Sequence, residues 1–351
     1  MLLAFFIGCV FGVISGLVPG VSLFVSLVMV YPFLLTMTPL EIMVVYITIL
    51  SISQFFGSVS ATLFSVPGSF TSLPALYEGH ILTKNNQGGE AIMLSAIGSF
   101  IGSVSAVGIS LLIVSHSTVI YSLFTTELRS LLLLLTLGLF VLIGRNSWYI
   151  NVLMVVAGIG LGLVGYDETY NRDVLTFGNM YLYNGLPNIS VVLALFIIPL
   201  LVTYIKPNNR VTFIKLSLQG YAVTLKGMVA RRYTLLRSII IGYIIGFIPG
   251  LTFHVGTTIA YYVEKKVTKD YKRGNLNCLL AAETANNTGA FSQILPLLLI
   301  GIPITNSQAF IYDILLSKNL PLTVDALYDM LSTITVAYVL SAVVGVYAAG
   351  K

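Results

Sequence analysis

Long apolar stretches separated by short polar segments make up the pattern of hydrophobic and polar positions along the chain. A helix needs about 20 apolar residues to cross the hydrocarbon core of a bilayer. Stretches that reach this length, or most of it, lie at residues 41–64, 91–114, 130–144, 150–165, 189–205 and 238–263. A helical soluble protein would instead show apolar stripes with charged faces. The pattern therefore predicts an all-α, polytopic transmembrane protein.

Two of the apolar stretches are interrupted in their middle by a proline followed by a glycine. Residues 2–35 contain Pro19 and Gly20, and residues 238–263 contain Pro249 and Gly250. Proline removes a backbone donor and clashes with the preceding turn, and glycine permits the backbone angles of a break. The preceding glycines have the same spacing in both copies, Gly12-x3-Gly16-x2-Pro19-Gly20 and Gly242-x3-Gly246-x2-Pro249-Gly250. We predict a broken helix or a helical hairpin at each site.

A second pair of interruptions follows the first at about 50 residues' distance. One contains Pro67 and the other Pro303, and each proline is followed by a run of hydroxyl or amide residues. Two breaks in the same order in each half indicate an internal repeat. Interrupted hydrophobic segments in corresponding positions of two halves point to the binding site of a transporter.

Composition strengthens the membrane prediction. Of 351 residues, 57% are hydrophobic and 9% are charged, whereas soluble domains carry about 25% charged residues. Seven basic residues and no acidic one lie between Lys206 and Arg237, and a second basic cluster spans residues 264–273. Such clusters occur in nucleic-acid-binding proteins. In a membrane protein they mark cytoplasmic loops, and we therefore expect no nucleic-acid partner.

The charged loops also predict an orientation. Both ends of residues 238–263 are basic, which places both on the cytoplasmic side if the chain folds back at the break. The loop at 167–173 lacks a basic excess and fits the opposite side. Counting spans backwards puts both ends of the first hairpin outside, so the two halves form inverted repeats with broken or re-entrant helices. The predicted parts are an N-terminal transmembrane repeat with connecting spans at 1–205, a basic cytoplasmic loop at 206–237, and a second, shorter repeat at 238–351.

The breaks carry the candidate binding residues. Helix N-termini exposed at a break stabilise an anion, and hydroxyl and carbonyl oxygens suit a hard cation such as Na+. The substrate-binding candidates are Pro19, Gly20, Ser22, Pro67, Gly68, Ser69, Thr71, Pro249, Gly250, Thr252, Asn286, Asn287, Pro303, Thr305 and Asn306. The ion-coupling candidates are Glu283, Asn287 and Ser65. The alternative roles are helix capping or packing for each hydroxyl and an ion pair with the basic loop for Glu283. His254, just after the second Pro-Gly break, could titrate near neutral pH, and polar packing is its alternative role.

Enzymatic and metal-binding classes find no support in the motifs. The sequence has no His-Glu-x-x-His element, no Gly-x-Ser-x-Gly elbow and no phosphate-binding lysine motif. Gly160-x-Gly162-x-x-Gly165 lies inside an apolar stretch and indicates helix packing. The two cysteines, Cys9 and Cys278, do not have the spacing of a zinc site or a disulfide framework. We expect no catalytic residue, no metal site and no cofactor, with Na+ only as a coupling ion.

Several of these segments together resemble the large permease subunit of tripartite tricarboxylate transporters, the TctA-type family. The matching segments lie at 12–20, 65–80, 164–186, 245–250, 281–290 and 295–303. The resemblance implies a permease of the inner membrane for citrate-like di- or tricarboxylates, driven by a sodium or proton gradient. It also implies two partners, a periplasmic solute-binding protein and a small membrane subunit.

The chain departs from the family pattern at two places. Ile304 follows Pro303 where the family has a glycine, and the family continues for several spans beyond Lys351. The alternative function is therefore a transport-inactive or auxiliary membrane subunit derived from such a permease.

Overall fold

The structure is a computed structural model of the chain. It describes residues 1–18, 20–65, 68–114, 147–167, 172–186, 225–248, 251–318 and 324–349, with isolated positions between 127 and 194. Two compact units emerge: unit 1 comprises Met1–Thr126 and Arg210–Lys351, and unit 2 comprises Glu127–Asn209. Several predicted features lie outside the described residues, namely Pro19, Pro67, Pro249, Gly250, most of the stretches at 130–144 and 189–205, and the basic loop up to residue 224.

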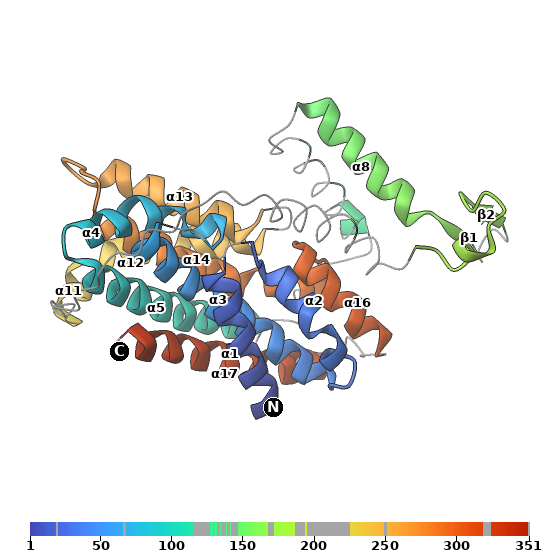
Figure 1. Cartoon of the computed structure of the whole chain (residues 1–351), viewed down its shortest axis with the longest axis horizontal. Helices are drawn as coiled ribbons and strands as arrows, with labels where there is room; N and C mark the ends of the chain where they lie inside the picture. Colours follow the sequence, from blue (N-terminus) through green and yellow to red (C-terminus); the bar gives the residue numbers. More distant parts are fainter. Residues whose placement is uncertain are drawn as a thin grey trace. The chain divides into compact units, whose positions relative to one another are not determined.

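Unit 1 is helical (Figure 1). Its first part contains α1 (Leu2–Leu17), α2 (Leu23–Leu34), α3 (Pro39–Phe64), the short 3-10 turn η1 (Phe70–Ser72), the π-helical turn η2 (Ala75–Gly79), α4 (His80–Lys84) and α5 (Gly88–Val114). Its second part contains α11 (Leu225–Ala230), α12 (Arg232–Phe247), α13 (Phe253–Val267), α14 (Leu276–Ser292), α15 (Ile294–Ile300), α16 (Asn306–Ser317) and α17 (Val324–Ala349). The prediction of a helical fold is confirmed.

The described part of unit 2 contains one helix, α8 (Trp148–Gly162), and a small hairpin. Strands β1 (Gly165–Asp167) and β2 (Arg172–Val174) pair antiparallel, with Gly165 opposite Val174. A 3-10 turn, η3 (Met180–Leu182), follows. The loop predicted at 167–173 thus overlaps both strands of this hairpin.

The first pair of interruptions separates α1 from α2 and α12 from α13. Val18 and Ile248, the residues before the two prolines, are both extended, with φ −91° and −77°. A residue that precedes proline is restricted to this conformation. Ser22 then caps α2, its side chain accepting a hydrogen bond from the Val25 amide at 3.3 Å, and Thr252 precedes α13 in the same extended conformation. The described residues that flank the two interruptions therefore share an extended backbone, although only Ser22 makes a side-chain cap bond.

The second pair of interruptions also begins alike. Ser65 ends α3 and Gly301 ends α15, and each has a left-handed backbone, with φ 60° and 69°. Each stands two residues before its proline. Glycine adopts this conformation freely, whereas serine seldom does. In the second half, the position with a positive φ is therefore a glycine, Gly301, two residues before Pro303. Ile304, directly after the proline, does not need a positive φ.

Glycines bring α1 against α3 and α12 against α14. A Cβ added at Gly12 would lie 2.6 Å from the Ile52 Cβ, and one added at Gly242 would lie 2.5 Å from the Ala285 carbonyl oxygen. Helices in membranes associate through small residues that permit such close approach. The regular glycine spacing seen in the sequence therefore serves helix packing in both halves.

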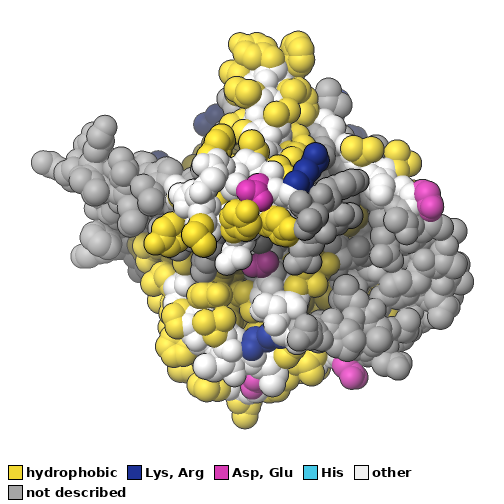
Figure 2. Space-filling view, turned by 90° about the vertical axis from the view of Figure 1, so that its right-hand side faces the viewer, with side chains coloured by type: hydrophobic (Ala, Val, Ile, Leu, Met, Phe, Trp, Pro, Cys, Tyr) yellow, Lys and Arg dark blue, Asp and Glu magenta, His cyan; other side chains and the backbone are white. Residues whose placement is uncertain are grey.

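In the part of the chain that the structure describes, three helices are long and apolar enough to cross a membrane: Pro39–Phe64, Gly88–Val114 and Asp329–Ala348. α3 and α14 lie inside the unit, and most of their side chains are buried. Large apolar side chains instead cover outer surfaces such as that of α1, where Leu2 is 87% exposed. On the face in Figure 2, the described side chains are mainly hydrophobic and charges are scattered. Such a surface suits lipid rather than water.

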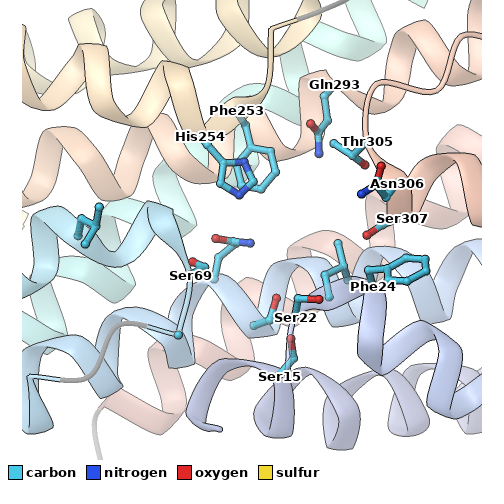
Figure 3. A pocket seen from close by; sticks show the side chains of 15 residues that line it. Ser15, Ser22, Phe24, Ser69, Phe253, His254, Gln293, Thr305, Asn306 and Ser307 are labelled. Carbon is cyan, nitrogen blue, oxygen red and sulfur yellow. The ribbon is translucent and has the colours of Figure 1, made fainter. Parts of the chain in front are cut away.

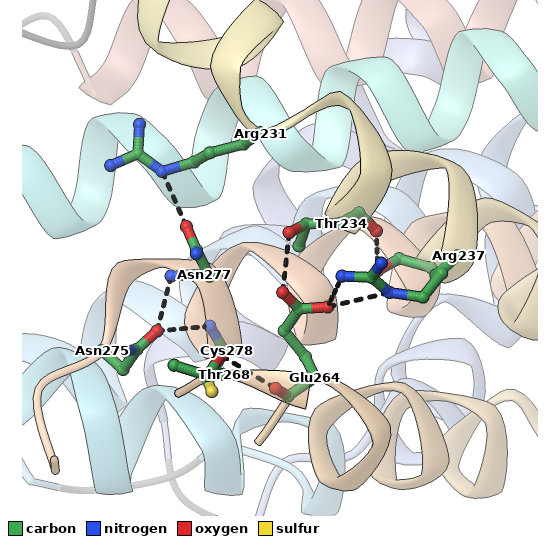
Figure 4. Close-up of polar contacts among 9 residues, drawn as sticks. Arg231, Thr234, Arg237, Glu264, Thr268, Asn275, Asn277 and Cys278 are labelled. Carbon is green, nitrogen blue, oxygen red and sulfur yellow. Dashed lines mark hydrogen bonds and ion pairs between the residues drawn. The ribbon is translucent and has the colours of Figure 1, made fainter. Parts of the chain in front are cut away.

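Arginines at the start of α12 fasten it to α13 and α14 (Figure 4). The Arg237 guanidinium donates to the Glu264 carboxylate at 2.6 and 3.2 Å, and the Thr234 hydroxyl donates to the same carboxylate at 2.7 Å. Arg231 Nε donates to Asn277 Oδ1 at 2.9 Å. Part of the predicted basic loop therefore has a structural role in addition to its charge.

A buried carboxylate joins the two halves at the same end. Glu78 of η2 is fully buried and accepts hydrogen bonds from the Tyr261 and Tyr271 hydroxyls. It also accepts from the backbone amides of Gly274 and Asn275, at 2.7 and 2.8 Å. Burial, followed by the Glu78 carboxylate, raises the pKa of Tyr271 above its usual value. Four donors thus satisfy a carboxylate that would otherwise be costly to bury.

Candidate functional site

A cavity of about 580 Å³ lies where all four interrupted segments meet (Figure 3). Its wall comes from segments that are far apart in the sequence. The lining residues are Ser15, Ser22, Leu23, Phe24, Ser53, Gln54, Gly68, Ser69, Leu73, Phe253, His254, Gln293, Thr305, Asn306 and Ser307. The wall combines hydroxyl and amide groups with apolar side chains. A cavity with a few convergent polar groups is the usual form of a small-molecule site.

The first half contributes a chain of side-chain hydrogen bonds at the cavity. The Ser69 and Thr71 hydroxyls are 2.6 Å apart, and the Thr71 hydroxyl donates to Gln54 Oε1 at 2.6 Å. The Asn286 amide of α14 donates to the same oxygen at 3.2 Å. Gln54 therefore links the second break of the first half to α14.

The second half contributes the start of α13 and the start of α16. His254 packs against Phe253, with ring centroids 4.2 Å apart, and both line the cavity. The Thr305 side chain caps α16 by accepting from the Gln308 amide at 3.2 Å. Gln308 Oε1 in turn accepts from the Ile304 amide at 2.7 Å, which holds the backbone of the break in place.

Three helix N-termini open onto this cavity. The first residues or caps of α2, α13 and α16 are lining residues, and these helices have 12, 15 and 12 residues. A helix N-terminus carries a partial positive charge and backbone donors without intrahelical partners. None of the described lining residues is acidic. The electrostatics of the cavity therefore favour an anion.

Gln293, between α14 and α15, is the most unusual group in the wall. It is 0% exposed, and neither its amide nitrogen nor its amide oxygen has a hydrogen-bond partner in the described structure. Buried polar groups are normally paired, and an exception calls for an explanation. In Figure 3 its amide lies beside Thr305 at the cavity. A bound ligand with hydrogen-bonding groups would satisfy it.

The structure places the predicted substrate residues at different distances from the cavity. Five line it: Ser22, Gly68, Ser69, Thr305 and Asn306. Two lie directly behind it, because Thr71 and Asn286 both bond to Gln54. Gly20, Thr252 and Pro303 belong to the breaks but do not line the cavity, and Pro19, Pro67, Pro249 and Gly250 are outside the described residues.

The predicted ion-coupling residues also separate. Asn287 does not line the cavity: its side-chain amide donates to the Glu283 backbone carbonyl, and its backbone carbonyl accepts from the Tyr338 hydroxyl. Ser65 is an exposed residue at the end of α3. Glu283 is buried in α14, and no pairing with the basic residues was found in the described part. The functional role of all these residues stays a prediction.

The sequence prediction missed Gln54, Gln293, Ser15, Ser53 and Ser307 as lining residues. Gln54 was detectable, because an amide in the middle of an apolar stretch is costly unless it has a partner. Gln293 precedes the second polar break by ten residues and offers the same signal. His254, for which packing was favoured, both packs and lines the cavity.

Long apolar helices, with shorter helices that break at a polar cavity, define a helical membrane protein of the transporter class. The chain belongs to the tripartite tricarboxylate transporter TctA family, whose sequence profile matches residues 2–351. The resemblance noted in the sequence is thereby confirmed. The family is one of transporters and not of enzymes.

One curated relative is similar to the chain over most of its length. This is an "Uncharacterized 52.8 kDa protein in TAR-I ttuC' 3'region" of Agrobacterium vitis, 26% identical over 313 residues. The match covers 85% of this chain and 60% of the relative, so the chain spans about 60% of that protein's length. No solved structure matches the chain.

Proposed function

We propose that the chain acts as the large permease component of a tripartite transporter and binds a small di- or tricarboxylate, such as citrate, in the cavity between the broken helices. The observation that carries this proposal is the convergence of three helix N-termini on a cavity whose described lining has no acidic residue. Broken helices in transporters present their N-termini to anionic substrate groups in the same way. Gln293 and the hydroxyls of Ser69 and Thr305 would hydrogen-bond the carboxylates.

The two halves are proposed to be inverted repeats around this cavity. Matched positions support the repeat: the extended residues Val18 and Ile248, and the left-handed residues Ser65 and Gly301. Ser69 and Thr305, each two residues after its proline, both line the cavity. Rocking of one repeat against the other would expose the cavity to alternate sides of the membrane.

The remaining parts of the proposal follow from family membership. The permease would reside in the inner membrane, use a sodium or proton gradient, and receive substrate from a periplasmic solute-binding protein beside a small membrane subunit. Transport by the chain in its present length would exclude the auxiliary role that the sequence left open.

Accumulation of radiolabelled citrate by vesicles, with the purified partner proteins supplied, tests the proposal. Gln293→Leu should lower the affinity for citrate about tenfold or more, because a buried amide bonded to a charged group contributes about 1.5–3 kcal/mol. The control is Gln87→Leu, the same change at an exposed glutamine before α5. Pro249→Ala, at the break between α12 and α13, should abolish uptake while the protein still reaches the membrane. Equal uptake by Gln293→Leu and Gln87→Leu would contradict the site.

A further inference from the structure

Glu283 of α14 is a buried carboxylate without a partner of its own. It is 1% exposed, and neither carboxylate oxygen has a hydrogen-bond partner among the described residues. An ionised carboxylate buried in this way costs several kcal/mol unless it is paired. The charge of the Glu283 carboxylate must therefore be neutralised by a bound cation or by a proton.

The helices α3 and α5, which pack against α14, carry buried hydroxyls without hydrogen-bond partners among the described residues. α5 approaches α14 so closely at Gly98 that an added Cβ would lie 3.7 Å from the Glu283 Cβ and 3.1 Å from the Thr284 hydroxyl. The Ser58 hydroxyl of α3 interacts with the carboxylate without reaching hydrogen-bond geometry. Ser95 and Ser99, on either side of Gly98, are buried with hydroxyls that have no partner in the part of the chain described.

The charged and titratable groups around α14 are already engaged elsewhere. Glu78 accepts four hydrogen bonds, Tyr261 donates to Glu78, and Arg237 pairs with Glu264. Tyr243 bonds to Ser110, Tyr338 donates to the Asn287 carbonyl, and His254 packs on Phe253 at the cavity. Within the described residues, Glu283 forms no ion pair with a positive side chain.

A hydrogen bond connects this carboxylate to the cavity. Gln54 lines the cavity and accepts from Asn286. Asn286 is three residues from Glu283 on α14, and Gln54 is four residues from Ser58 on α3. Residues at these spacings lie on the same face of a helix. The pairs Gln54–Asn286 and Ser58–Glu283 therefore lie about one helical turn, or about 5 Å, apart.

We propose that Glu283, with Ser58 and the serines of α5, forms a site for one monovalent cation, and that the Gln54–Asn286 bond couples its occupancy to the carboxylate cavity. This inference rests on the proposed function. A single cation balances the single carboxylate charge, and carboxylate and hydroxyl oxygens are the ligands that hard cations prefer. The cation can be Na+ or a proton, because either one neutralises the Glu283 carboxylate.

Binding of radiolabelled citrate to the full chain in lipid nanodiscs tests the coupling. One arm varies the Na+ concentration at fixed pH, and the other varies the pH without Na+. In the wild type, citrate affinity should rise with one of the two cations by about 5- to 150-fold, the usual range of coupling between sites. Glu283→Gln should remove this dependence. Glu90→Gln, at an acidic residue in the first turn of α5, is the control and should keep it.

Two further variants test the parts of the site separately. Ser58→Ala removes one hydroxyl and should raise the cation concentration for half-maximal citrate binding about tenfold. Asn286→Ala should leave direct binding of radioactive sodium, or proton uptake, intact while weakening the dependence of citrate binding on the cation. Asn286 would then be a positioning residue, because it acts through Gln54.

Three results would overturn the inference. The first is citrate binding by the wild type that is the same at all Na+ concentrations and pH values, which leaves the proposed function standing. The second is Glu283→Gln with wild-type cation dependence. If the wild type binds no citrate, the proposed function fails, and the cation site is then judged by direct sodium binding and proton uptake. In that case, the third contradicting result is equal binding by the wild type and Glu283→Gln.

Discussion

The substitution Gly242→Ala tests the packing of α12 against α14, on which the cavity depends. The added Cβ would lie 2.5 Å from the Ala285 carbonyl oxygen and 2.8 Å from the Ala285 Cα. Ordinary van der Waals contact begins at 3.4 Å, and the added Cβ would lie only 2.5 Å from the carbonyl oxygen. The helices would therefore have to separate by about 0.9 Å, the difference between these two distances. Both obstacles are backbone atoms, which cannot rotate away. Overpacking of this kind costs about 1–3 kcal/mol.

The assay is thermal unfolding of the purified protein in detergent, followed by citrate binding. Gly108→Ala on α5 is the matched control, because an added Cβ there meets no atom within 4 Å. Alanine favours a helix over glycine by about 1 kcal/mol, so the control should be as stable as the wild type or more stable. Gly242→Ala should unfold at a lower temperature. Equal unfolding temperatures for the two variants would refute the close approach of α12 and α14.

Two further predictions concern the buried carboxylate of Glu78 and the cap of α16. Four donors attach Glu78 to α13 and the loop that follows it, and Glu78→Gln removes the negative charge that they bind. Trypsin should therefore cleave this loop at Lys269, Lys272 or Arg273 faster in Glu78→Gln than in the control Glu90→Gln. Equal cleavage rates in the two variants would contradict the role of Glu78. Thr305→Ala removes the cap of α16 and should lower the free energy of unfolding by about 1 kcal/mol. Thr305→Ser keeps a hydroxyl and should retain most of this stability. An equal loss of stability in the two variants would show that the hydroxyl is not the cap.

The sequence predicted the interruptions because their cause is local. Proline and glycine act on their own backbone, so the breaks after Leu17 and Phe247 could be located without any tertiary information. The glycine spacing was equally visible, but its purpose was not. Only the structure shows that Gly242 meets Ala285, because this contact depends on which helices are neighbours.

The wall of the cavity was harder to predict because it depends on helix rotation. Asn286 and Asn287 are adjacent in sequence, but successive residues of a helix point in different directions. The Asn286 side-chain amide donates to Gln54 at the cavity, whereas the Asn287 side-chain amide donates to the Glu283 backbone carbonyl of its own helix. Gln54 and Gln293 lie in different halves of the chain, and packing alone brings both to one cavity. A search for amides within apolar stretches would have found both residues, but not their meeting.

Protection of single cysteines by citrate tests the central claim, that a carboxylate occupies the cavity where the broken helices meet. In a chain with Cys9 and Cys278 replaced by serine, Ser22→Cys and Asn306→Cys would place an exposed thiol on each half of the cavity wall. Ser332→Cys, exposed on α17, is the control. We expect citrate to slow the reaction of a thiol reagent at both cavity positions and not at the control. Unchanged reaction rates at Ser22→Cys and Asn306→Cys under saturating citrate would contradict the claim.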